Sequence, residues 1–74
     1  MTRLPMLKAR DVARALRTLG FVPMRQRGSH IFFAHTDGRT TLLPKHGGED
    51  IGRGLLRQIL REIEVTSDTF EKLL

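Results

Sequence analysis

The chain has 74 residues, a formal net charge of +5 and no cysteine. We expect a single domain over residues 1–74 with a small core, because a chain of this length buries only about 60–65% of its unfolded surface. The composition excludes disulfides and thiolate zinc sites, and no apolar run reaches the roughly 18 residues of a membrane span, so we expect a soluble cytoplasmic protein with no membrane contact.

Positive charge is concentrated in the first two thirds of the chain. Residues 1–48 hold nine Lys or Arg against two acids, a balance of +7, whereas residues 49–74 hold four against six, a balance of −2. Ten of the thirteen basic residues are arginine, whose planar guanidinium suits phosphate oxygens. The asymmetry favours a polyanionic partner for the basic part, and an ordinary solvated surface is the alternative.

Residues 9–19 have the periodicity of an amphipathic helix. Its apolar side chains recur four and three residues apart and are Val12, Leu16 and Leu19. Gly20 follows and is expected to cap the C-terminal end. The opposite side carries a row of arginines, namely Arg10, Arg14 and Arg17. Such a row suits a nucleic-acid backbone, although a solvated helix face would look the same.

Three extended segments follow, over residues 21–27, residues 29–35 and residues 40–43. Gly28 separates the first two, and Asp37-Gly38 is typical of a hairpin turn between the last two. Alternation gives the middle strand one face with His30, Phe32 and Ala34, and another with Ile31, Phe33 and His35. Each face carries a phenylalanine, so periodicity leaves open which face is buried and whether the first histidine is exposed.

The remaining segments are a loop over residues 44–50, a helix over residues 52–63 and a short helix over residues 68–74. The longer helix has an apolar face made of Leu55, Leu56, Ile59, Leu60 and Ile63. The order of helix, three antiparallel strands, helix and short helix indicates an α+β domain of two layers. We expect a three-stranded antiparallel sheet with its helices on one face.

His30, His35 and His46 are the side chains that titrate near neutral pH and are therefore the candidate general acids and bases. The first two lie five residues apart on one strand and point to opposite faces, which argues against a shared metal ion. A site of His46 with Glu49 or Asp50 is the remaining metal alternative. We predict that the chain holds no metal and needs no cofactor.

Metal-free cleavage of RNA requires a base for the 2′-hydroxyl proton, cations for the phosphate and an acid for the leaving 5′-oxygen. We expect His30 to be the catalytic base. The expected RNA-binding residues surround it or follow the last strand, and they are Arg25, Arg27, Gly28, Ser29, Lys45 and His46. Among them His46 is the candidate acid. A purely structural His30, hydrogen-bonded beside the turn, is the alternative.

Four short segments occur in order along the chain: Leu19-Gly20-Phe21, Arg27-Gly28-Ser29-His30, Leu43-Pro44-Lys45-His46 and Gly54-Leu55-Leu56-Arg57-Gln58-Ile59-Leu60. In this order and spacing they resemble the HicA family of toxins, which are small mRNA interferases of bacterial toxin–antitoxin pairs. The resemblance implies a fold like that of the double-stranded-RNA-binding domain, α-β-β-β-α. It also implies an RNA-cleaving toxin with His30 as its catalytic histidine and a HicB-type antitoxin as partner.

Two other functions fit the basic charge. A non-catalytic RNA-binding module of the same fold would bind through phosphates and 2′-hydroxyls without cleaving. A docking surface for an acidic protein would leave nucleic acid out altogether. Many relatives of the family continue the Gly-Ser-His motif with another histidine, where this chain has Ile31, so the acid that protonates the leaving group is not identified by the motif.

Overall fold

The computed structural model describes residues 6–74. Its elements in chain order are β1 (Leu7–Lys8), α1 (Ala9–Thr18), β2 (Val22–Arg27), β3 (His30–Ala34), β4 (Thr40–Pro44), β5 (Asp50–Ile51), α2 (Arg53–Ile63) and α3 (Ser67–Glu71). The predicted order of helix, three strands and helix is confirmed, as is the α+β class. No helix within residues 6–74 is both long enough and apolar enough to cross a membrane.

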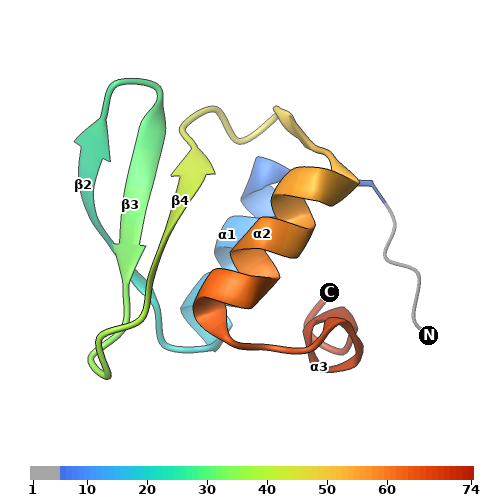
Figure 1. Ribbon diagram of the computed structural model, residues 1–74. Helices are drawn as coiled ribbons and strands as arrows, with labels where there is room; N and C mark the ends of the chain where they lie inside the picture. Colours follow the sequence, from blue (N-terminus) through green and yellow to red (C-terminus); the bar gives the residue numbers. More distant parts are fainter. Residues whose placement is uncertain (1–5) are drawn as a thin grey trace.

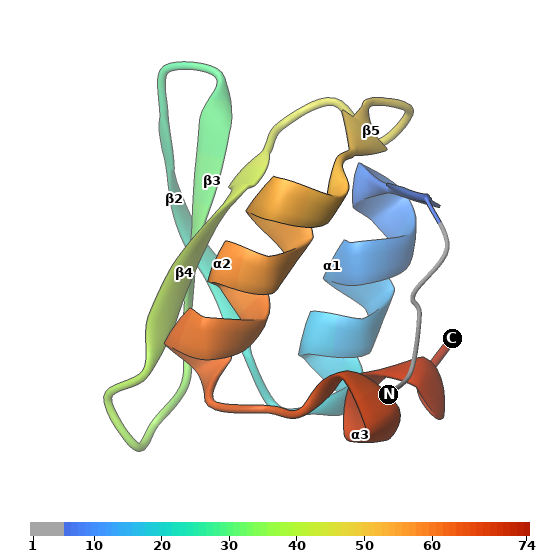
Figure 2. The same cartoon turned by 45° about the vertical axis from the view of Figure 1, so that its right-hand side comes forward.

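The domain has two layers. Strands β2, β3 and β4 form an antiparallel sheet in that order, and α1 and α2 lie side by side against one face of it (Figures 1 and 2). Both helices begin at the end of the molecule where β5 lies and run in the same direction (Figure 2). The hairpin turn between β2 and β3 lies at this same end, so it is brought towards the N-terminal ends of both helices.

The buried side chains come from both layers and explain the arrangement. Each helix turns its apolar stripe to the sheet, and the fully buried members include Val12 and Leu16 from α1 and Ile59 and Ile63 from α2. From the sheet, Phe33 is 1% exposed and packs in the same core. The face of β3 that carries Phe33 is therefore the core face, which answers the question that strand periodicity left open.

A second, two-stranded sheet was missed by the sequence prediction. Residues 44–50 were expected to be loop throughout, but β5 pairs with β1 in antiparallel register, with Leu7 opposite Ile51. Both side chains are buried, and this burial stabilises a ladder too short to be recognised from its pattern. The predicted boundaries also shift: β3 begins after the turn rather than at Ser29, and α3 starts at Ser67 behind a Thr66 cap.

Both long helices end in the same hydrogen-bonded motif. At the end of α1, Gly20 has φ 98°, and the amide of Phe21 donates to the carbonyl of Leu16 at 2.9 Å. This is the pattern of a Schellman motif, and it confirms the predicted glycine cap. At the end of α2, the amide of Val65 donates to Leu60 in the same way, but the left-handed residue is Glu64, with φ 58°.

Replacing this glutamate by glycine is expected to stabilise the domain. A non-glycine residue in the left-handed region carries a steric cost that glycine avoids, so Glu64→Gly should raise the free energy of unfolding by about 1 kcal/mol. Arg61→Gly, one turn earlier within α2, should lower it by about 1 kcal/mol, because glycine in a helix interior costs backbone entropy. Urea denaturation followed by circular dichroism measures both free energies of unfolding. A loss of stability in Glu64→Gly would contradict the left-handed conformation of Glu64.

Candidate functional site

The Gly28-Ser29 segment forms a two-residue hairpin turn between β2 and β3, with Arg27 directly opposite His30. Gly28 has φ 58°, and a side chain added there would meet nothing within 4 Å. Glycine is thus required by the backbone angle of the turn and not by crowding. The consequence is that His30 is held at the first position of β3, where it is exposed to solvent.

The end of β4 lies next to this turn. Pro44 is directly opposite His30, and the amide of Lys45 donates to the carbonyl of Ser29 at 2.8 Å. The hydroxyl of Ser29 lies 3.4 Å from Nδ1 of His30, a long contact that the rotation of either side chain can shorten. The predicted Gly-Ser-His and Pro-Lys-His segments are therefore adjacent in the fold.

The sheet face opposite the helices carries His30 together with apolar and cationic side chains. Directly opposed residues on neighbouring strands share a face. Arg25, Phe32 and Leu42 therefore lie together on this open face, and Arg27 lies on it opposite His30. The guanidinium of Arg25 lies over the Phe32 ring, 5.4 Å from its centroid. The sequence has no acid from Val12 to Thr36, so the two arginines of β2 have no acidic neighbour along their own strand or β3.

His46 lies one residue beyond Lys45 and is exposed. Its carbonyl accepts the amide of Glu49 at 3.0 Å, which closes a turn at this point of the loop. Within residues 6–74 no hydrogen bond joins His46 to His30, and no three His, Asp or Glu side chains gather in a way that could hold a metal ion. The structure thus brings most of the predicted site together but leaves the candidate acid at its edge.

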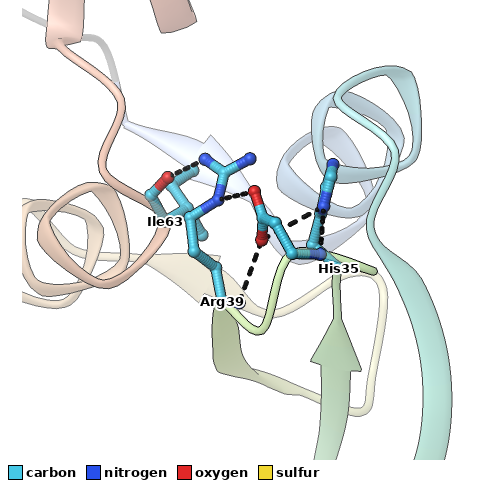
Figure 3. Close-up of polar contacts among 4 residues, drawn as sticks. His35, Arg39 and Ile63 are labelled. Atoms are coloured by element: carbon cyan, nitrogen blue, oxygen red, sulfur yellow. Dashed lines mark hydrogen bonds and ion pairs between the residues drawn. The ribbon is translucent and has the colours of Figure 1, made fainter.

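His35 has a structural role at the other end of the sheet. Its ring contacts Phe21 edge to face, with centroids 5.1 Å apart, and its Nδ1 accepts the amide of Asp37 at 3.1 Å. Arg39 pairs with Asp37 through Nε at 2.8 Å and donates to the carbonyl of Ile63 (Figure 3). The backbone amide of Arg39, together with its guanidinium, lowers the pKa of the Asp37 carboxyl below its ordinary value.

A shallow groove of about 490 Å³ lies beside this cluster. Its lining residues are Asp37, Gly38, Arg39, Thr40, Glu62 and Glu64. Three of the six are acidic, so the groove repels phosphate and does not extend the basic site. Of the three candidate histidines, His30 and His46 are exposed, whereas His35 is half-buried against Phe21 and hydrogen-bonded to Asp37.

One basic residue near the site was predicted from the sequence only as part of the helical arginine row and not among the RNA-binding residues. Arg10, in the first turn of α1, donates its amide to the carbonyl of Gly47 at 3.0 Å, and its side chain runs beside the loop that carries Lys45 and His46. In the sequence it belongs to a regular helical row of arginines. Only the fold, through the pairing of β1 with β5, shows that the first member of this row meets the loop.

Comparison with known proteins identifies a family for this chain. The model of the family described as HicA toxin of bacterial toxin-antitoxin matches residues 9–65, which is most of the chain. The match runs from the start of α1 to the end of α2 and so includes the whole three-stranded sheet and the Gly-Ser-His turn. No curated protein matches. The chain therefore belongs to the HicA family and is the toxin of a bacterial toxin–antitoxin system, with an antitoxin as its partner.

Proposed function

We propose that this toxin is a metal-independent endoribonuclease that cleaves mRNA, with His30 as the general base. One observation carries the proposal: an exposed imidazole stands directly after the hairpin turn, with Arg27 opposite it on β2 and with the Lys45 backbone hydrogen-bonded to the turn. A histidine can take a proton near neutral pH, and the two cations favour a phosphate at the same place. A solvated histidine with no cationic neighbours would not support this function.

The chemistry follows from these positions. The imidazole of His30 removes the 2′-hydroxyl proton, and the 2′-oxygen attacks the adjacent phosphorus. The bond from phosphorus to the 5′-oxygen then breaks, giving a 2′,3′-cyclic phosphate and a 5′-hydroxyl end. Arg25, Arg27 and Lys45 offset the negative charge that develops on the phosphate oxygens, and the Gly28-Ser29 turn supplies further hydrogen-bond donors.

The leaving 5′-oxygen needs a proton, and His46 is the proposed donor. It follows Lys45 in the loop, and the Lys45 amide is bonded to the turn that carries His30. No hydrogen bond fixes the imidazole of His46 within the described residues. Bound RNA would therefore have to bring this imidazole next to the leaving 5′-oxygen. An apo enzyme often shows catalytic contacts that tighten only with substrate, which is consistent with this arrangement.

The antitoxin in this proposal is of the HicB type, and both proteins act in the cytoplasm. The open face is suited to occlusion by a protein, because Val22 and Leu42, opposite Ala34 and Phe32 on this face, expose 51% and 39% of their surface. Arginines beside these apolar side chains favour a partner with acidic groups. Covering this face would also cover His30.

The direct test is incubation of the purified chain with a defined RNA in the presence of a chelator, followed by gel electrophoresis. We expect discrete RNA fragments, whereas DNA of the same sequence should stay intact because it lacks the 2′-hydroxyl. The alternative function, a non-catalytic RNA-binding module, is favoured because no hydrogen bond within residues 6–74 joins the His46 imidazole to His30. Intact RNA that is retarded in the gel in a salt-sensitive way would support that alternative and contradict the proposed ribonuclease.

A further inference from the structure

Arg10 lies against two glycines of the loop that follows β4. A Cβ placed on Gly47 would lie 3.4 Å from the Cβ of Arg10, and one placed on Gly48 would lie 3.9 Å from its Nη1. The amide bond from Arg10 to the Gly47 carbonyl, 3.0 Å long, fixes the backbones of the two segments. The guanidinium therefore extends along a stretch of loop that has no side chains of its own to cover it.

The guanidinium of Arg10 is also available to a ligand. Several cations of the described residues are engaged: Lys8 pairs with Asp50, Arg14 with Asp11 at 3.5 Å, and Arg39 with Asp37. Over residues 6–74, Arg10 has no such ion pair, and it is exposed. A free guanidinium presents a planar set of donors that matches the oxygens of a phosphate.

The distance to the proposed site is short. The amide of Lys45 is hydrogen-bonded to the turn beside His30, and Gly47 lies two residues further along the chain. Successive Cα atoms are 3.8 Å apart, so the Cα of Gly47 lies within about 7.6 Å of the Cα of Lys45. A side chain as long as arginine, starting beside Gly47, can thus reach a phosphate next to one that Lys45 holds.

We propose that Arg10 is a phosphate-binding residue of the RNA site. This inference rests on the proposed ribonuclease function. It adds the direction of the bound RNA, which runs from His30 across the loop of Lys45 and Gly47 towards the first turn of α1. The rest of the arginine row is not part of this path. Arg17 lies two turns further along the same helix, near its C-terminal end, and serves as the matched control.

The experiment measures binding of a short single-stranded RNA by fluorescence anisotropy at several salt concentrations, with His30→Ala in every protein so that the RNA stays intact. One lost phosphate contact should reduce the salt slope by about 0.7, which corresponds to about a fivefold weaker Kd at 0.1 M salt. Arg10→Ala is expected to show both the smaller salt slope and the weaker Kd. Arg10→Lys, which keeps the charge, should restore most of the slope.

The control separates a local contact from the effect of net charge. Arg17→Ala removes the same charge from the same helix and should change the Kd less than twofold. If Arg10→Ala and Arg17→Ala give the same affinity and the same slope, the inference about Arg10 is wrong, while cleavage by the parent chain would leave the ribonuclease proposal standing. If the chain binds no RNA at all, both proposals are overturned.

Discussion

The His30→Ala variant is expected to cleave RNA about 10²–10⁴ times more slowly than the parent, because that is the contribution of one positioned general base. The side chain is exposed at the start of β3, so its removal leaves no cavity and the fold should be unchanged. Single-turnover cleavage of a defined RNA, with circular dichroism as the check on folding, measures the effect.

The control for this prediction is His35, which directly follows the same strand at its other end. His35→Ala removes an imidazole that packs against Phe21, so we expect lower stability but an unchanged cleavage rate for each folded molecule. If both histidine variants cleave like the parent, His30 is not the base. If His35→Ala alone is slow while fully folded, the catalytic histidine has been assigned to the wrong end of the sheet.

Phe33→Ala is expected to lower the free energy of unfolding by about 3–5 kcal/mol, the usual cost of truncating a buried phenylalanine. Phe33 is 1% exposed and lies between the sheet and the two helices. A domain of this size has a total stability of only about 4–11 kcal/mol, so the variant should be largely unfolded in mild urea. Urea denaturation followed by circular dichroism would show the shift in midpoint.

Its neighbour Phe32 is the matched control. It lies on the open face, where its ring is only partly covered and is contacted by the guanidinium of Arg25. Phe32→Ala should therefore cost about 1 kcal/mol, mostly through the lost contact with the cation. Equal effects of the two substitutions would mean that the sheet face carrying Phe33 is not the buried face. His30 would then not lie on the exposed face.

The main elements were predictable because each has a strong local cause. The apolar stripes of α1 and α2 recur at helical spacing, and Gly20 ends α1 with the backbone angle that glycine permits. The turn at Gly28 and the proline at the end of β4 bound the strands in the same direct way. The order of elements, and hence the α+β class, followed from these segments.

The exposure of His30 was not predictable from the sequence. Phe32 and Phe33 are adjacent and chemically identical, so strand alternation gives two equivalent choices of the buried face. The choice is made by packing, since Phe33 meets the helices together with Leu43 across the sheet. Neither the sequence pattern nor the packing of the sheet establishes the catalytic role of His30, which stays a prediction.

The small sheet of β1 and β5 was missed because a two-residue strand has no periodicity to detect. This small sheet bears on the proposed RNA site. By holding the segment before α1 beside the loop that ends in β5, it places Arg10 against Gly47. A helical row of arginines in the sequence contains no information about which of its members meets the loop.

The most direct measurement of the central claim is mass spectrometry of the RNA ends released in a chelator by the parent chain and by His30→Ala. We predict 2′,3′-cyclic phosphate and 5′-hydroxyl ends from the parent, almost none from His30→Ala, and no cleavage at a site whose 2′-hydroxyl has been replaced by hydrogen. Ends with a 3′-hydroxyl and a 5′-phosphate, or equal cleavage by the two proteins, would contradict it.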